Sequence, residues 1–347
     1  MMMPTLPSFQ DVLHQTEGGK RHLLLGNGFS IAWKKGVFAY DSLFAKADLS
    51  RLSKPARQIF AELKTSNFEL VMGLLRDAGT VLKYYGPNAK AIGKRVRADA
   101  DALKEILVGA IAGSHPETPG SVTVEEYERC GAFLRNFDGS VYTANYDLLL
   151  YWVLMHFKDT AQKIRCNDGF QKDEDEPEAD FVSWDGGSGH KQNIFFLHGA
   201  LHVFDAETKI EKFTWSNTGI RLIDQIRAAL DSNKFPLFVS EGSSAEKRKA
   251  ILHNGFLHKA SRSFAEITGS LFTYGLSFAD NDQHKSRMIE RGHVTTLAVG
   301  IYGNSADEAN RAIMNRVGAM QRRRPEVRRR SELIVLFYDA ETAHVWR

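Results

Sequence analysis

Short runs of apolar residues along the chain alternate with longer segments in which apolar residues recur every three or four positions. The first run, Leu23 to Leu25, is followed at once by the turn Gly26-Asn27-Gly28 and by a helix that starts near Ser30. Further strands are predicted at 141–143, 193–203, 236–240, 271–275, 296–302 and 333–338. Because strands that alternate with helices are typical of a parallel sheet covered on both faces, we expect a Rossmann-like α/β fold.

The segment from Ser53 to about Ala112 has a helical pattern without strands, with a break at Tyr84-Tyr85-Gly86-Pro87. We therefore expect one domain, residues 1–347, that carries a helical insertion at 51–120 between its first and second strands. Other helices are predicted at 8–14, 122–135, 148–157, 218–230, 244–264 and 282–291, and a last one through Met320. The segment 34–44 is predicted to be a loop over the glycine turn, and the acidic segment 167–189 a solvated loop.

Polar residues follow four of the predicted strands, in GNGFS, TANYD, LHGAL and YGLSFADND. Ligands of open parallel sheets bind beyond the carboxyl ends of the strands, so these four turns are expected to meet in one crevice. Each also has a simpler interpretation. Asn145 with Asp147, and Asp280 with Asp282, are residue types that cap helices, and His198 is compatible with a hydrogen-bonded core histidine.

Composition narrows the class of protein. The 347 residues, 43% of them hydrophobic, suffice for a large core, and the net charge of +3 does not by itself indicate a nucleic-acid-binding protein. Cys130 and Cys166 are the only cysteines, which excludes a disulfide scaffold and a four-cysteine zinc module. The N-terminus lacks the features of a signal peptide, and no apolar run is long enough to span a membrane. These features predict a soluble cytoplasmic protein.

Two further clusters bear on ligands. His190, His198 and His202, with Cys166, are metal-ligating residue types, but Gly199 interrupts the strand and no carboxylate accompanies them, so we expect no metal. The segment 322–330 contains six arginines in nine residues. This run is the only place where the sequence suggests nucleic acid or an acidic partner, and a surface turn between the last helix and the last strand is the favoured interpretation.

Together, the four motifs resemble those of the sirtuin-like NAD-consuming family, in the same order along the chain. GNGFS resembles the family's glycine-rich phosphate loop, and TANYD resembles its Thr-Gln-Asn-x-Asp motif, with Asn145 and Asp147 in register. Leu197-His198-Gly199 resembles the catalytic His-Gly, and Gly275-Leu276-Ser277 resembles the Gly-x-Ser turn. The resemblance covers about residues 21–302 and implies a Rossmann-like fold that binds NAD+.

The departures from the family pattern indicate which branch of the sirtuin-like family the chain resembles most. The sequence GVFAYDSLF stands where sirtuin deacylases carry Gly-Ile-Pro-Asp-Phe-Arg, and two cysteines cannot form their zinc ribbon. The chain is most similar to the sirtuin-like domains of bacterial antiphage systems that hydrolyse NAD+. The resemblance therefore implies an NAD+ glycohydrolase that releases nicotinamide and ADP-ribose, uses NAD+ as substrate without zinc, and depletes the NAD+ of infected cells.

The resemblance also implies roles for individual residues. Asn145 is expected to bind the ribose or position water, and His198 to act as general base. The expected NAD-binding residues are Gly26, Asn27, Gly28, Phe29, Ser30, Thr143, Asp147, Gly275, Ser277 and Asn281. Amides of 26–29 and the Ser30 hydroxyl would hold phosphate, Thr143 and Asp147 would orient neighbours, and Ser277 and Asn281 would contact the adenosine.

Partners and alternative functions follow from the same comparison. The expected partners are a second copy of the chain, in a homo-oligomer, and a second defence-system protein. A non-catalytic sensor of NAD+ or ADP-ribose, an NAD-dependent deacylase and an ADP-ribosyltransferase are the alternatives, and the missing zinc ribbon counts against the deacylase.

Overall fold

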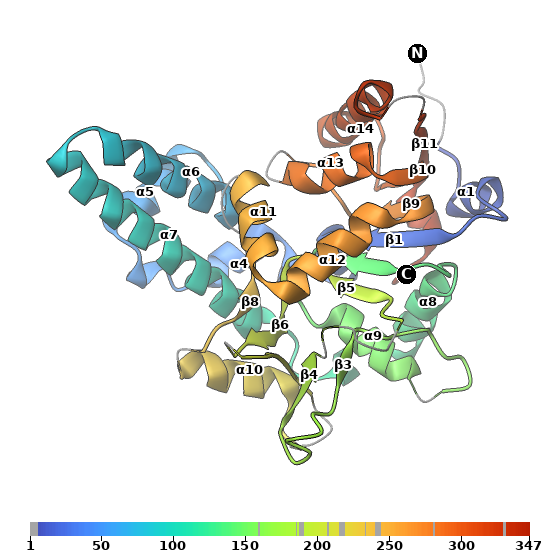
Figure 1. Ribbon diagram of the computed structural model, residues 1–347, viewed down its shortest axis with the longest axis horizontal. Helices are drawn as coiled ribbons and strands as arrows, with labels where there is room; N and C mark the ends of the chain where they lie inside the picture. The colour runs from blue at the N-terminus through green and yellow to red at the C-terminus, as the bar shows by residue number, and fades with distance from the viewer. Residues whose placement is uncertain are drawn as a thin grey trace.

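A computed structural model describes residues 6–158, 160–184, 186, 191–206, 208–214, 219–232, 234–239, 244–279, 282–328 and 331–347. Six strands form an all-parallel sheet in the order β11-β10-β9-β1-β2-β5 (Figure 1). They are β1 (Arg21–Leu25), β2 (Val141–Thr143), β5 (Ile194–Phe196), β9 (Thr268–Tyr274), β10 (His293–Ile301) and β11 (Ile334–Asp339). Counted along the chain, this is the Rossmann order 3-2-1-4-5-6, which confirms the predicted fold class.

Helices cover both faces of this sheet. On one face Leu23 and Leu25 share a core with α1 (Phe9–Gln15), α8 (Val124–Leu134) and α9 (Leu149–Phe157). On the other face Leu24 packs in a second core with three helices, which are α12 (Gly255–Glu266), α13 (Gln283–Arg291) and α14 (Glu308–Val327). Alternate residues of one strand thus enter two cores, as the two-residue repeat of a strand requires. Among the described residues, no helix is both long and apolar enough to cross a membrane.

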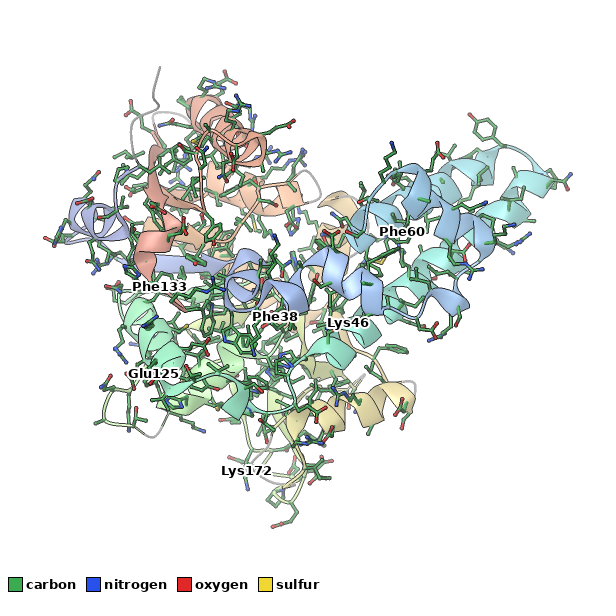
Figure 2. All side chains as sticks on the ribbon, turned by 180° about the vertical axis from the view of Figure 1, so that it is seen from behind. Phe38, Lys46, Phe60, Glu125, Phe133 and Lys172 are labelled. Carbon is green, nitrogen blue, oxygen red and sulfur yellow. The ribbon has the colours of Figure 1, made fainter. Side chains whose placement is uncertain are left out.

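The segment between β1 and β2 is helical, as the sequence pattern predicts. It contains α2 (Gly28–Trp33), α3 (Lys35–Phe38), α4 (Tyr40–Lys46), α5 (Lys54–Glu62), α6 (Phe68–Val81) and α7 (Pro87–Ser114). Helices α5, α6 and most of α7 project from the body as an arm, in which Phe60 lies, and Phe38 lies near its base (Figures 1 and 2). The predicted loop at 34–44 is wrong: Phe38 and Leu43 are buried, and burial holds this segment in the short helices α3 and α4.

A second sheet, antiparallel and in the order β3-β4-β7-β6-β8, lies below the first in Figure 1. Its strands are β3 (Phe170–Gln171), β4 (Phe181–Trp184), β6 (Gly199–Asp205), β7 (Ile210–Phe213) and β8 (Pro236–Phe238). The predicted break of the strand 193–203 at His198-Gly199 is therefore confirmed, and the two halves belong to different sheets. Gly199 makes the change of direction possible, because its φ is +87° and a Cβ there would lie 1.9 Å from the Leu237 carbonyl oxygen.

The acidic segment 167–189 is not simply a solvated loop, because β3 and β4 lie within it. Lysines of and beside β7 neutralise its carboxylates: Lys212 pairs with Asp168 at 2.5 Å, and Lys209 with Asp173 at 3.3 Å. These partners lie about forty residues further along the chain. The pattern of the acidic segment alone therefore could not predict them.

The C-terminal half differs from expectation at two other places. The predicted helix 244–264 is divided into α11 (Ser244–His253) and α12, where the Asn254 side chain accepts a hydrogen bond from the Leu257 amide. The helix predicted at 218–230 is confirmed for its described part by α10 (Leu222–Asp231), which lies between β7 and β8. The predicted surface turn at 322–330 is wrong for the described part. Helix α14 continues to Val327, and the buried Arg324 donates to carbonyl oxygens on and after α13.

Candidate functional site

The loops after β1 and β9 meet at the point where the strand order of the parallel sheet reverses. The amides of Gly26 and Gly28 donate to the carbonyl oxygens of Tyr274 and Gly275, both at 2.9 Å. A Cβ on Gly28 would lie 2.4 Å from the Cα of Gly275, whose own φ is +69°. We call this backbone packing of Gly26 and Gly28 against Gly275 the glycine contact. It explains why glycine is needed in both motifs, and it forms the floor of a topological switch point, where open α/β sheets bind ligands.

The glycine contact changes the expected mode of phosphate binding. The Gly26 and Gly28 amides are occupied by β9, and the Phe29 amide donates to the Gly26 carbonyl oxygen at 2.9 Å. Within 26–29 only the Asn27 amide has no hydrogen-bond partner among the described residues. The expectation that the amides of 26–29 hold phosphate is therefore wrong for three of the four.

Ser30, Asn145 and Asp147 form a buried hydrogen-bonded chain, which we call the Ser30 triad. The Ser30 hydroxyl donates to Asp147 Oδ2 at 2.5 Å and accepts from Asn145 Nδ2 at 3.0 Å. Thr143 Oγ1 accepts from the Asn145 amide at 3.0 Å and fixes the start of this turn. Both hydrogen bonds of the Ser30 hydroxyl are thus made within the protein, and the bond to Asn145 holds that side chain in place.

Asp147 combines two of the alternatives that the sequence leaves open. Its Oδ1 accepts from the Leu149 amide at 2.9 Å, so it stabilises the start of α9 as a capping residue does. Its Oδ2 belongs to the Ser30 triad. Burial raises the pKa of Asp147, although the hydrogen bonds from Ser30 and Leu149 lower it in part. Asp147 therefore organises the turn rather than facing substrate as an exposed charge.

A cavity of about 560 Å³ opens over the glycine contact. Its walls come from the ends of β1, β2, β5 and β9, from α3 and α4, and from the inner ends of α6 and α7. Of the predicted site residues, those lining it are Gly26, Asn27, Gly28, Asn145, Asp147, His198, Gly275 and Ser277. Its volume lies within the range of small-molecule and cofactor sites. The structure thus brings all four predicted motifs to one cavity.

His198 lies in the wall of this cavity at the junction of β5 and β6, and it is buried. Its Nε2 is 3.2 Å from Nε2 of His284 on α13, and among the described residues its Nδ1 has no hydrogen-bond partner. Burial, together with the nearby Lys285, lowers the pKa of His198 well below the usual range of histidine, although Asp282 raises it in part. At pH 7 the His198 ring is therefore uncharged, and the shift makes it a weaker base than a free imidazole.

Four charged residues from three distant segments meet beside His198, and we call them the charge cluster: Glu69, Lys247, Asp282 and Lys285. Lys247 Nζ, almost fully buried, is 3.1 Å from Glu69 on α6 and 3.5 Å from Asp282. Lys285 Nζ is 2.8 Å from the other oxygen of Asp282. Although burial acts in the opposite direction, Lys285, His198 and Lys247 hold the pKa of Asp282 well below its usual range. The cluster thus joins the helical arm to α11 and α13 by balanced buried charges.

One group of side chains has the spacing of a metal site. Ligand atoms of His198, Asp282 and His284 lie within 4.8 Å of one another. Both carboxylate oxygens of Asp282, however, face lysine ammonium groups. A divalent cation would have to displace two lysines from an already balanced cluster, which weighs against a metal at this position.

Other residues that the sequence suggested lie elsewhere. Phe29, Ser30 and Thr143 are behind the cavity wall, and Asn281 and Asp280 lie outside the described residues, as does His190. His202 is fully buried against Phe196 and Tyr151 and is not among the residues that line the cavity. Asp282 begins α13, but its side chain makes no capping hydrogen bond.

Sequence reasoning missed His284, Lys285, Lys247 and Glu69. His284 and Lys285 directly follow the polar stretch SFADND, which was a usable signal. No local sequence pattern marks Lys247 and Glu69 as site residues, because only the fold brings them together as an ion pair.

The fold and the site together define a Rossmann-type α/β protein with a ligand-sized cavity at the switch point of its parallel sheet. The chain belongs to the family described as a domain of unknown function (DUF4917), whose model matches residues 23–346. The match runs from β1 to the end of the chain and so includes both sheets and the helical arm. No curated protein matches the chain at a significant level. The family description names no activity, and the sirtuin-like resemblance stays a prediction based on the four motifs.

Proposed function

We propose that this protein is an NAD+ glycohydrolase that cleaves NAD+ to nicotinamide and ADP-ribose. The observation that carries the proposal is that Asn145 and His198 line one cavity over the glycine contact at the switch point. The switch point of a Rossmann sheet is where dinucleotides bind. The motifs that resemble the sirtuin-like family contribute the residues of this cavity.

Cleavage of NAD+ does not require the protein to protonate the leaving group. Nicotinamide departs as a neutral molecule from a cationic ring, so no general acid is required, and the anomeric carbon becomes oxocarbenium-like as in other glycoside cleavage. In this proposal Asn145, whose Nδ2 donates to Ser30, bonds a ribose hydroxyl or the attacking water. The neutral His198 accepts the proton from that oxygen, and the carboxylate of Asp282 beside it stabilises the resulting imidazolium.

Diphosphate binding has to use groups other than the occupied loop amides. Lys35 on α3 and Arg347 both line the cavity, and neither forms an ion pair with another described residue. The Asn27 amide adds one backbone donor. We propose that these groups neutralise the diphosphate, while the Gly275–Ser277 turn contacts the adenosine half. This replaces the phosphate loop of the sequence-based expectation.

The biological role inherited from the resemblance, NAD+ depletion in antiphage defence with a homo-oligomer or a second defence protein, is part of the same proposal. It depends on the activity, which is tested first. Purified protein is incubated with NAD+, and nicotinamide and ADP-ribose are followed by chromatography. We expect both products in equal amounts from the wild type, and a rate at least about a hundredfold lower for His198→Ala.

His14→Ala is the matched control, because His14 is exposed on α1 and lies outside the residues that line the cavity. Thermal melting of each variant separates loss of activity from loss of fold. Full turnover by folded His198→Ala and Asn145→Ala would overturn the assignment of both residues. NAD+ binding without turnover would favour the non-catalytic sensor.

A further inference from the structure

A second hollow, of about 720 Å³, lies between α11, α12 and α13 and is separate from the cavity. We call it the basic groove. Five of its lining residues are cationic: Arg248, Lys249, Arg262, Arg287 and Arg291. None of its described lining residues is acidic. A concave surface lined by positive charges raises the local concentration of anions.

Most of these cations are not neutralised within the protein. Arg248, Lys249 and Arg291 are exposed, and none of them forms an ion pair with another described residue. Arg262 pairs with Glu266 at 3.5 Å, but both side chains are more than 65% exposed, so this pair contributes little. The groove therefore carries an excess of positive charge that an external anion can balance.

Part of the lining of the groove is apolar. Ile251 and Leu252 come from α11, Ala265 from α12 and Met288 from α13. Apolar side chains next to several cations are complementary to a ligand that has flat, weakly polar rings and several phosphates. Such a ligand is a nucleoside polyphosphate or a short single strand of nucleic acid, whose phosphates contact arginine and lysine while its bases lie against the apolar side chains.

His284 connects the groove with the cavity. It lines the groove, and its Nε2 is 3.2 Å from Nε2 of His198 in the cavity wall. Its Nδ1 is buried and has no hydrogen-bond partner in the described part of the chain. Because the two nitrogens of an imidazole point in nearly opposite directions, Nδ1 is directed away from His198. A buried polar atom without a partner is costly, and a water or a ligand atom that reaches this nitrogen after a small side-chain movement would remove the cost.

The tautomers of the two rings give this link a direction. If His198 accepts a proton on Nδ1, its Nε2 carries hydrogen and donates to Nε2 of His284. The hydrogen of His284 then resides on Nδ1, on the side away from the cavity. A phosphate oxygen that accepts from this atom stabilises that arrangement of both rings, and so stabilises His198 as a base.

We propose that the basic groove binds a phosphate-rich nucleotide ligand, and that His284 couples its occupancy to the cavity as a positioning residue. The proposal of a binding site depends only on the shape and charge of the groove. The coupling rests on the proposed function, because its consequence is a faster reaction at His198.

Binding is tested by calorimetry with two probes, ATP and a ten-nucleotide oligothymidylate, each at several salt concentrations. We expect at least one probe to bind, with an affinity that falls as salt rises. The double substitution Arg248→Ala with Arg291→Ala should weaken binding by about tenfold and reduce the salt slope for the oligonucleotide by about 1.4. Binding of ATP alone would identify a mononucleotide site, and binding of both a site for nucleotide chains.

The matched control is Lys94→Ala with Arg95→Ala, two exposed cations on α7 outside the groove. Asn145→Ala controls for binding of ATP in the cavity, and it should leave groove binding unchanged. The groove is overturned if neither probe binds, or if the groove variant binds as tightly as the control variant.

Coupling is tested by adding the bound probe to the NAD+ assay. We expect kcat to rise severalfold at nearly constant KM, and His284→Leu to abolish the increase while the probe still binds. Probe binding without any NAD+ cleavage would sustain the groove and refute the proposed function. NAD+ cleavage that is identical with and without bound probe would refute the coupling.

Discussion

Two walls of the same cavity are built in different ways. One is formed by the glycine contact and backed by the Ser30 triad, whose members lie within three short motifs and interact through backbone packing and side-chain hydrogen bonds. The other is the charge cluster, whose four residues come from α6, α11 and the start of α13. The first wall is encoded locally and the second only by the fold. Substitutions should therefore affect them by different amounts and through different physical terms.

The largest effect is expected at Lys247. Lys247→Met leaves Glu69 and Asp282 buried with fewer positive partners, and breaking a buried charge pair lowers the free energy of unfolding by about 4 kcal/mol. Urea denaturation measures this change. Lys249→Met, on the exposed side of the same helix, should change stability by less than about 0.5 kcal/mol. A Glu69→Leu and Lys247→Met double variant should recover part of the loss, and no recovery would contradict the ion-pair interpretation.

The next effect concerns the glycine contact. Gly275→Ala introduces a Cβ 2.5 Å from the Gly28 Cα in a residue with φ of +69°. Strain and overpacking together should lower the free energy of unfolding by about 3 kcal/mol. Gly303→Ala is the control, because its φ is +74° but no atom lies within 4 Å of the added Cβ. Equal destabilisation by both substitutions would mean that close packing at the switch point contributes nothing.

A pH effect should appear at His115, which joins the end of α7 to the start of α9. Its Nε2 accepts from the Leu148 amide at 3.0 Å, and burial lowers its pKa to about 4. The unfolded chain, with the ordinary histidine pKa of about 6.5, binds this proton more readily, so stability is lost as the pH falls below about 6.5. Between pH 7 and pH 5 the protonation of this histidine should lower the free energy of unfolding by about 2 kcal/mol.

Denaturation of the wild type and of His115→Gln across that pH range measures the contribution. Glutamine keeps a hydrogen-bond acceptor but does not titrate, so the stability of the His115→Gln variant should vary less with pH. Parallel pH curves for the two proteins would refute the role of His115.

The smallest effect on stability is expected in the Ser30 triad. Ser30→Ala leaves Asp147 Oδ2 and Asn145 Nδ2 without their observed partner, which should lower the free energy of unfolding by about 1.5 kcal/mol. Ser42→Ala, which removes a surface hydrogen bond of 3.3 Å, is the matched control. If Ser30→Ala destabilised the protein more than Lys247→Met, the contrast between the two walls would be false.

The same contrast explains what the sequence could predict. The strand ends that carry the motifs were placed correctly, because apolar runs and glycine turns are local signals. The sequence also suggested that these ends converge, and all four motifs line the cavity. Their amides and the Ser30 hydroxyl were expected to bind phosphate, but the chain itself occupies most of these groups.

Elements stabilised by distant partners were the ones missed. Helices α3 and α4 are four and seven residues long and lack side-chain caps, so only the burial of Phe38 and Leu43 reveals them. The strands in the acidic segment depend on Lys209 and Lys212. Arg324 is buried because α13 and β10 offer it carbonyl oxygens, which no local pattern indicates.

The central claim, that NAD+ binds in the cavity between the two walls, is tested most directly by titrating NAD+ into the His198→Ala variant. Without the proposed base NAD+ is cleaved at least about a hundredfold more slowly, so calorimetry during a short titration reports binding with little contribution from cleavage. We expect one NAD+ per chain, and at least tenfold weaker binding when Asn145→Ala is added. Absence of binding at millimolar NAD+, in a variant that melts like the wild type, would contradict the account.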